Sequence, residues 1–243
     1  MTLHGKRALI TGASGTLGSA IATRLAREGA HVLLHANARP EAVQALAEQI
    51  RAAGGQAETV VFDLTDRAAT AAACEAMLVG GAVQVLVNNA GLHDDAVFPG
   101  MRGDQWDRVI DVSLNGFFNV TQPLMLPMLR TRWGRILNIS SVAAIAGNRG
   151  QVNYAAAKGA LNSATKALSL EVASRGVTVN AIAPGIIASP MADVAFDAKA
   201  IAELVPVKRA GTAEEVAALA AFLAGPEAGY ITGQVISING GMI

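Results

Sequence analysis

The chain has 243 residues, of which 52% are hydrophobic and 16% are charged, so it can bury a large core and fits one domain better than two. Nineteen basic and nineteen acidic side chains balance, which excludes the basic surface typical of a nucleic-acid-binding protein. No apolar stretch reaches the ~20 residues of a membrane-spanning helix, and residues 1–6 lack the apolar core of a secretory signal. We therefore expect a cytoplasmic protein that binds a small molecule and has no membrane or nucleic-acid partner.

Short runs rich in β-branched residues alternate along the chain with longer segments rich in alanine and leucine. The short runs predict strands over residues 7–11, 31–35, 58–62, 84–87, 135–139, 177–182 and 234–238. The longer segments predict helices over residues 17–28, 40–53, 67–79, 103–130, 153–174 and 213–224. Several strands are apolar without alternation, which is typical of strands buried on both faces. This order predicts a doubly wound, Rossmann-like α/β fold in a single domain, residues 1–243, with helices on both faces of a parallel β-sheet.

The longest irregular segment is residues 184–209, between the sixth strand and the last helix. Loops of this length often close over a site, so we expect this one to cover the substrate. No catalytic metal is expected, because the four histidines lack the spacing of metal ligands. The only cysteine, Cys74, is expected to be a small buried apolar residue.

A glycine-rich turn directly follows the first predicted strand and leads into a helix. Its residues are Thr11, Gly12, Ala13, Ser14, Gly15, Thr16, Leu17 and Gly18. In this context a glycine turn lets backbone amides approach a pyrophosphate at the positive end of the helix. The turn therefore predicts a dinucleotide site.

The end of the second strand indicates which nicotinamide cofactor binds. An acidic residue there would accept hydrogen bonds from the NAD ribose, but the sequence has Asn37 and Arg39 instead. An amide and a guanidinium favour the 2′-phosphate of NADP. The alternative is that Arg39 is only a solvated residue at the start of a helix.

Polar residues also end the third and fourth strands, at the sheet edge where open α/β sheets bind ligands. Asp63 would reach an adenine there. Asn88 and Asn89 precede Ala90 and Gly91 beside the expected cofactor, which favours a site role for the pair. The alternative is that the two asparagines only form a turn.

A tyrosine and a lysine four residues apart, Tyr154 and Lys158, share one face of a predicted helix. A phenol titrates near ~10, so Tyr154 donates a proton at neutral pH only if a cation such as Lys158 stabilises the phenolate. Ser141, after the fifth strand, would orient a substrate carbonyl, although serines at strand ends are more often caps. Asn115, followed by Gly116, predicts a local bulge in the long helix that holds a water.

With these motifs assembled, the chain resembles the short-chain dehydrogenase/reductase family over essentially its whole length. Within that family, residues 147–161 and the ending at residues 230–241 most resemble bacterial 3-oxoacyl-(acyl-carrier-protein) reductases. The resemblance implies NADPH-dependent reduction of a 3-oxoacyl thioester, in fatty-acid or polyketide-type biosynthesis, with acyl carrier protein as the partner. It also implies a homotetramer, or a mixed oligomer, built from residues 103–130, residues 153–174 and the carboxyl end.

The resemblance assigns roles to single residues as well. Tyr154 would donate the proton, Ser141 would hold the carbonyl oxygen, and Lys158 would bind the nicotinamide ribose and stabilise the phenolate. Asn115 would carry the water that refills the proton relay. The remaining expected cofactor contacts are Gly12, Ser14, Gly15, Thr16, Leu17, Gly18, Asn37, Arg39, Asp63, Leu64, Asn89, Ala90, Gly91, Pro184, Gly185, Ile187 and Ser189. Docking of the acidic carrier would use Arg132 and Arg175.

One departure from the family pattern concerns the glycine turn. Short members usually have glycine where Thr16 stands, and many NADPH-using members have a basic residue where Gly15 stands. The spacing of Gly12, Gly15 and Gly18 is more like that of extended members and of polyketide ketoreductase domains. This departure bears on how the pyrophosphate sits in the turn.

Two alternative functions remain open. The first keeps the reaction and changes the ketone to a sugar, a cyclic alcohol, a steroid or a small diketone, because specificity depends on loops, here residues 91–103 and 184–209. The second is a catalytically silent, cofactor-binding subunit of a mixed oligomer.

Overall fold

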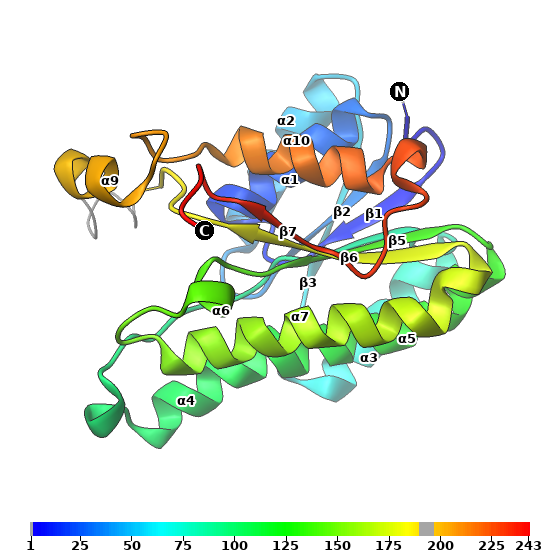
Figure 1. Cartoon of the computed structure of the whole chain (residues 1–243). Helices are drawn as coiled ribbons and strands as arrows, with labels where there is room; N and C mark the ends of the chain where they lie inside the picture. Colours follow the sequence, from blue (N-terminus) through cyan, green and yellow to red (C-terminus); the bar gives the residue numbers. More distant parts are fainter. Residues whose placement is uncertain (1, 190–196) are drawn as a thin grey trace.

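The computed structural model describes residues 2–189 and 197–243, and these form one sheet of seven parallel strands in the order β3-β2-β1-β4-β5-β6-β7 (Figure 1). The strands are β1 (Arg7–Ile10), β2 (His31–Ala36), β3 (Gln56–Val61), β4 (Val85–Asn88), β5 (Gly134–Ile139), β6 (Val177–Pro184) and β7 (Val235–Ile238). The central strands β4, β5 and β6 are buried along their whole length, as their largely apolar sequences predict. The predicted doubly wound fold is confirmed.

Helices cover both faces of the sheet (Figure 1). One layer contains α1 (Thr16–Arg27), α2 (Pro40–Ala52) and α10 (Ala213–Ala224). The opposite layer contains α3 (Arg67–Val79), α4 (Gly103–Ile110), α5 (Gly116–Arg130) and α7 (Val152–Val172). Successive strand residues alternate between two hydrophobic clusters, so that Ile10 and Leu34 pack on the first layer and Leu9 and Leu33 on the second. No helix within the described ranges is long and apolar enough to cross a membrane.

Several short elements lie between these helices and strands. They are the helices α6 (Ala143–Ala146) and α9 (Ala198–Leu204) and the 3-10 turns η1 (Phe98–Gly100), η3 (Ala173–Arg175) and η4 (Pro226–Ala228). The segment 184–209, predicted to be irregular, therefore contains a helix, and Ile187 in it forms a parallel bridge with Gly211. Residues 190–196 of this segment lie outside the described residues, and its role as a substrate loop stays a prediction.

The long helix predicted over residues 103–130 is divided by a π-helical turn, η2 (Asp111–Asn115). The N–H of Gly116 bonds to the carbonyl of Asp111, five residues earlier, and this wider turn accommodates one extra residue. Gly116 also packs closely on a neighbouring segment, since a Cβ there would lie 3.2 Å from the Cβ of Leu64. The local bulge predicted at Asn115 is thus present as a π-turn.

The strand order places a switch point at the centre of the sheet. The chain runs outward from β1 to β3 and then crosses back to form β4 on the other side of β1. The loops that follow β1 and β4 therefore diverge and leave a crevice at the carboxyl edge of the sheet. The glycine turn follows β1, and residues 89–97 follow β4.

Candidate active site

Two glycines shape the turn between β1 and α1. Gly12 has a φ of +64°, and a Cβ on Gly18 would lie 2.3 Å from the carbonyl oxygen of Gly12, so both positions require glycine. Gly15 is less constrained, because a Cβ there would lie 3.5 Å from its nearest neighbour. Thr16 is exposed and is the first residue of α1. The departure at Thr16 therefore does not disturb the closure of the turn.

The start of α1 is suited to an anion. Its N-cap residue, Gly15, provides no side-chain cap, and its first turn contains no acidic residue. The first N–H groups of the helix are thus left for an outside acceptor. Ser14 is half-buried beside this helix start, whereas Leu17 packs against the hydrophobic core. These features fit the pyrophosphate of a dinucleotide.

His35 supports the turn, although its only signal in the sequence is a polar residue within an apolar strand. The Gly12 N–H donates to Nδ1 of His35 at 3.1 Å, and Nε2 donates to the Phe62 carbonyl at 3.0 Å. Burial lowers the pKa of His35 to about 4, so the ring is neutral at pH 7, with one nitrogen donating and the other accepting. The neutral ring joins the glycine turn to the end of β3.

Thr11 and Asn89 join the ends of β1 and β4. The Thr11 hydroxyl accepts the N–H groups of Asn89 and Ala90, both at 2.9 Å, and the Asn89 amide donates to the Thr11 carbonyl at 2.8 Å. Asn89 therefore holds the glycine turn in place. Asn88 instead lies in the core and donates to Asn138 at 2.9 Å, so the site role predicted for Asn88 is wrong.

Asn37, Arg39 and Asp63 lie at the ends of β2 and β3. The Asp63 carboxylate accepts the N–H and the hydroxyl of Thr65, both at 2.8 Å. These bonds, with a further one from Asn37, hold the pKa of Asp63 below its usual range. Arg39 is exposed at the N-cap of α2, and within the described residues no hydrogen bond or ion pair occupies its guanidinium. A cation is thus open to an anion at the position predicted for the ribose.

Ser141, Tyr154 and Lys158 meet at the carboxyl edge of β5. The Lys158 ammonium lies 5.7 Å from the centre of the Tyr154 ring, and Ser141 forms a hydrogen bond with the phenol. Burial raises the pKa of Tyr154, the bond to Ser141 lowers it, and the charge of Asp95 raises it. The phenol is therefore protonated at neutral pH and lies beside a hydroxyl and a cation.

The Lys158 ammonium is buried, with 2% of the residue exposed. It donates to the Ile139 carbonyl at 2.8 Å. Burial lowers the pKa of Lys158 to about 8, which still leaves the charged form predominant at pH 7. A Cβ on Gly91 would lie 3.0 Å from Nζ, so glycine at this position keeps that side of the ammonium open.

The structure does not bring the Asn115 side chain into this group. Asn115 is exposed, and its amide donates to the Asp111 carboxylate at 2.6 Å. Ser113 of the same π-turn is buried instead, and a Cβ on Gly91 would lie 3.5 Å from its hydroxyl. The physical reason is the extra residue of the π-turn, which changes the residue that faces α7. Ser113 rather than Asn115 is therefore the buried polar residue of this turn, and the water-carrying role that the resemblance implies for Asn115 stays a prediction.

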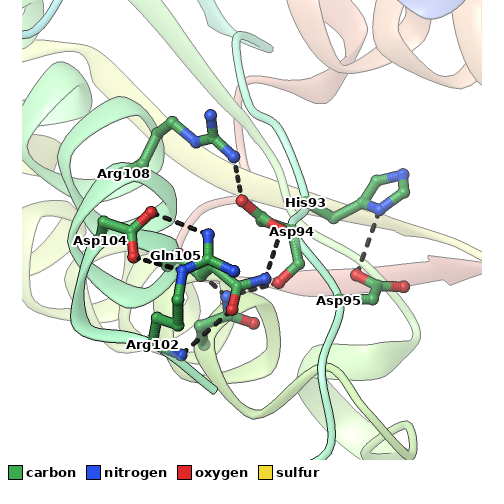
Figure 2. Close-up of polar contacts among 8 residues, drawn as sticks. His93, Asp94, Asp95, Arg102, Asp104, Gln105 and Arg108 are labelled. Carbon is green, nitrogen blue, oxygen red and sulfur yellow. Dashed lines mark hydrogen bonds and ion pairs between the residues drawn. The ribbon is translucent and has the colours of Figure 1, made fainter. Parts of the chain in front are cut away.

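The loop after β4, residues 91–97, is fastened by a polar cluster (Figure 2). Asp94 accepts from the Gln105 amide at 2.7 Å and forms an ion pair with Arg108. Arg102 at the start of α4 pairs in turn with Asp104. These contacts attach the loop to α4.

The same loop places two titratable side chains next to the tyrosine. His93 and Asp95 form a pair, with 3.1 Å between Nδ1 and Oδ1 (Figure 2). The His93 ring lies edge-on to the Tyr154 ring, 6.2 Å between centres, and Asp95 also accepts from Gln151 at 2.8 Å. His93 and Asp95 thus form one wall beside the reactive phenol.

Asn153 positions the tyrosine, although its sequence context does not mark it. It is fully buried, and its amide donates to the carbonyls of Asp94 and Gln105 at 3.0 and 3.1 Å. Its side-chain oxygen accepts the N–H of Tyr154 at 2.8 Å. One amide therefore connects the loop after β4, helix α4 and the first turn of α7.

The other predicted cofactor residues lie around this crevice, with one exception. Leu64 is buried, and its carbonyl accepts from Asn119 at 2.8 Å, so it belongs to the core. Pro184 ends β6, and Ile187 and Ser189 continue from it along the same edge. A Cβ on Gly185 would lie 2.8 Å from the Cα of Asn239. Glycine is therefore needed at this position because the chain packs closely on the carboxyl-terminal segment.

The two arginines expected to dock a carrier lie at the other edge of the sheet. Arg132 precedes β5 and has a φ of +52°, and Arg175 precedes β6 in η3. Both are exposed and neighbour each other, because the Gly134 N–H donates to the Gly176 carbonyl. Within one chain they do not share the edge that carries Tyr154.

Nothing in the described part of the chain forms a metal site, since no group of three or more His, Cys, Asp or Glu side chains is placed to hold an ion. Cys74 is buried as predicted, and burial raises the pKa of its thiol to about 11. The glycine cradle, the open start of α1 and the exposed Arg39 instead fit a phosphorylated dinucleotide.

Comparisons with known proteins agree with this geometry. Residues 6–200 match the family model described as short chain dehydrogenase. The chain is 43% identical over 236 residues to the 3-oxoacyl-[acyl-carrier-protein] reductase FabG of Aggregatibacter actinomycetemcomitans, covering 96% of this chain and 98% of that protein. It is 43% identical over 245 residues to nodulation protein G of a Rhizobium species, covering 99% and 98%. It is 41% identical over 246 residues to the FabG reductase of Thermotoga maritima, covering 100% of both.

Proposed function

The chain belongs to the short-chain dehydrogenase/reductase family, and on this premise we propose that it uses NADPH to reduce a 3-oxoacyl thioester, carried by acyl carrier protein, to the 3-hydroxyacyl thioester. It is an oxidoreductase with a nicotinamide cofactor. The observation that carries the reaction type is the meeting of Ser141, Tyr154 and Lys158 at the switch-point edge of the sheet. Support for the substrate comes from reductase relatives that match over nearly the full length.

Each of the three residues has one task in this reaction. The bound cofactor supplies the hydride to the carbonyl carbon. Ser141 donates a hydrogen bond to the carbonyl oxygen, and Tyr154 transfers its phenolic proton to that oxygen as it becomes an alcohol. The positive charge of Lys158 stabilises the phenolate that is left behind. A proton from solvent must then return to Tyr154 before the next turnover.

The direct test is a panel of 3-oxoacyl thioesters, on acyl carrier protein and on small thiols, with NADPH oxidation as the readout. We expect turnover by the purified chain alone, with the carrier-bound substrates preferred. Turnover of cyclic ketones or sugars in place of every thioester would reject the substrate. Absence of turnover with any ketone would favour a silent subunit.

The proposal of NADPH rather than NADH is supported by Arg39 and by the lack of an acidic residue at the end of β2. Arg39→Ala should raise the KM for NADPH about tenfold and leave the KM for NADH nearly unchanged, because only NADPH carries the 2′-phosphate. Arg130→Ala, an exposed arginine at the end of α5, is the control. Equal effects on both cofactors would contradict this role.

The assembly and the location of the protein follow from the same proposal. We place the chain in the cytoplasm, where a carrier-borne acyl substrate of fatty-acid or polyketide-type synthesis would meet it. We also propose a homotetramer, since α5 and α7 carry exposed apolar side chains at Phe118, Leu126 and Leu170. Such a subunit contact would bring the exposed arginines of one chain near another chain. Arg132 and Arg175 could then dock a carrier whose acyl group enters the site of the neighbouring subunit.

A further inference from the structure

Asn153 uses every hydrogen-bonding group of a fully buried amide. It lies in the first turn of α7, directly before Tyr154, and 0% of the residue is exposed. Its amide donates to the carbonyls of Asp94 and Gln105 at 3.0 and 3.1 Å. Its side-chain oxygen accepts the N–H of Tyr154 at 2.8 Å. An amide has two N–H donors and one oxygen, whereas an aspartate of the same size has no donor, so these three bonds require asparagine.

The bond from Asn153 holds the loop after β4 at a peptide group between two acidic residues. The carbonyl that accepts it belongs to Asp94 and is linked to the N–H of Asp95. Asp94 is also held from a second side, because its carboxylate accepts from the Gln105 amide at 2.7 Å (Figure 2). Asn153, Asp94 and Gln105 therefore close a ring of hydrogen bonds that joins α7, the loop and α4.

A second side chain of the same helix start attaches this loop at the surface. The Gln151 amide donates to the Asp95 carboxylate at 2.8 Å, and this bond is exposed. Water competes for exposed hydrogen-bonding groups, whereas a buried carbonyl that loses its partner also lacks hydration. The bonds of Asn153 are therefore the stronger restraint on the loop, and they also reach the backbone of Tyr154.

The position of the loop determines the surroundings of the Tyr154 phenol. Burial raises the pKa of Tyr154, the bond to Ser141 lowers it, and the charge of Asp95 raises it. The His93 ring of the loop covers the tyrosine edge-on, with 6.2 Å between the ring centres. If the loop moved away, the phenol would become more hydrated and the carboxylate charge would be more distant. Both changes would lower the pKa of Tyr154.

We propose that Asn153 is a positioning residue for the proton donor, because its buried amide holds the loop that carries His93 and Asp95 against the Tyr154 ring. The loop after β4 thereby controls how acidic the phenol is, although the proton itself comes from Tyr154. The proposal rests on the proposed reductase function for its kinetic consequence. The titration of the phenol can be measured without any substrate.

The charged and titratable groups around Tyr154 belong to α7, the loop after β4 and α4. They are Lys158 of α7, His93, Asp94 and Asp95 of the loop, and Arg102 and Arg108 of α4. Among the acidic groups, Asp95 is the one whose charge acts on the phenol. Lys158 is held separately, by its bond to the Ile139 carbonyl at 2.8 Å. Release of the loop should therefore change the effect of Asp95 and leave Lys158 in place.

The first test titrates the phenol and needs no substrate. Phenolate absorbance is measured in a Tyr230→Phe background, because the chain has only two tyrosines. Asn153→Ala should move the midpoint of Tyr154 to lower pH. In an Asp95→Asn background the same substitution should move it less, since the charge is already absent. Equal shifts in the two backgrounds would show that Asn153 does not act through the loop and would overturn the proposal.

The second test is kinetic and has a matched control. Asn153→Ala should lower kcat about tenfold and move the alkaline limb of kcat to lower pH, with the KM for NADPH nearly unchanged. Asn180 is also 0% exposed, and its amide bonds to the backbone of residues 231 and 234. Asn180→Ala should destabilise the fold comparably and leave the limb in place. A limb that moves equally in both variants, or in neither, would overturn the proposal.

A milder variant guards against unfolding, because Asn153→Ala leaves two buried carbonyls without a partner. Asn153→Ser keeps one donor and should shift the phenol titration in the same direction by a smaller amount. If only the serine variant folds, an unchanged titration in that variant rejects the role of Asn153.

The two proposals fail separately. If Asn153→Ala shifts the phenol titration but the wild-type chain reduces no 3-oxoacyl thioester, the substrate is wrong and the role of Asn153 stands. If the wild-type chain reduces the thioester and the substitution leaves the titration unchanged, the role of Asn153 is wrong and the substrate stands.

Discussion

Tyr154 is surrounded by groups that act on its proton in opposite directions. Burial and the charge of Asp95 favour the neutral phenol, and the bond to Ser141 favours the phenolate. Lys158 lies on the same helix face with most of its charge retained at neutral pH. Replacing a single neighbouring residue should therefore change the pKa of the Tyr154 phenol.

Replacing Asp95 with asparagine should lower the pKa of Tyr154, because the carboxylate charge that opposes the phenolate is removed. The alkaline limb of carbonyl reduction should move to lower pH with it, since the protonated phenol is the acid. The chain has two tyrosines, and the other, Tyr230, is fully exposed. In a Tyr230→Phe background, phenolate absorbance therefore reports Tyr154 alone. Asp104→Asn, in the same polar cluster, is the control, and an equal shift there would contradict the assignment.

The neutral His35 should make stability depend on pH. Its pKa is about 4 in the folded chain against an ordinary value of 6.5, so the unfolded chain takes up a proton first as the pH falls. The stabilisation is complete above pH 6.5 and is lost as the pH falls from 6.5 to 4, by about 3 kcal/mol in total. Urea unfolding of the wild type and of His35→Gln across this range measures it. Glutamine keeps a donor and an acceptor but does not titrate. If the free energy of unfolding changed with pH equally in the wild type and in His35→Gln, a group other than His35 would cause the change.

Among the elements, the turn between β1 and α1 is packed so closely that one added carbon atom at Gly18 would clash with its backbone. Gly18→Ala should destabilise the protein by more than about 2 kcal/mol and weaken NADPH binding, because its Cβ would meet the Gly12 carbonyl. Gly15→Ala should be nearly neutral in thermal unfolding, since its Cβ meets no close neighbour. Thermal unfolding and cofactor titration of both variants provide the measurement. Comparable destabilisation by the two substitutions would contradict the close contact between Gly18 and the Gly12 carbonyl.

The elements also show what a sequence can and cannot reveal. The strands were predictable because β4, β5 and β6 are buried on both faces and are therefore apolar throughout. The Tyr154–Lys158 pair was predictable because residues four apart in a regular helix lie on the same face. The bulge was predictable from Asn115 and Gly116, but the burial of Ser113 in it was not, since burial depends on how the turn packs in the folded chain. His35 was missed for a similar reason, because its partner Gly12 lies on another strand end.

For the whole molecule, α5 and α7 carry apolar side chains that an isolated chain would leave exposed to water. Leu126 and Leu170 are 65% and 84% exposed, and large exposed apolar side chains on neighbouring helices mark association surfaces. Leu170→Glu should therefore yield a smaller species in light scattering after size exclusion. Val79→Glu, at an apolar residue 90% exposed on α3, is the control. An unchanged mass for Leu170→Glu would remove α7 from the interface.

The deep burial of Cys74 makes the native chain useful for labelling. Its thiol stays protonated at neutral pH and is shielded by the core, and thiolate is the form that reacts with maleimides. A cysteine introduced at Phe98, which is 62% exposed beside the site, would then be the only reactive thiol. A fluorophore attached there would report on the segment that follows the loop after β4, and the native Cys74 would be kept.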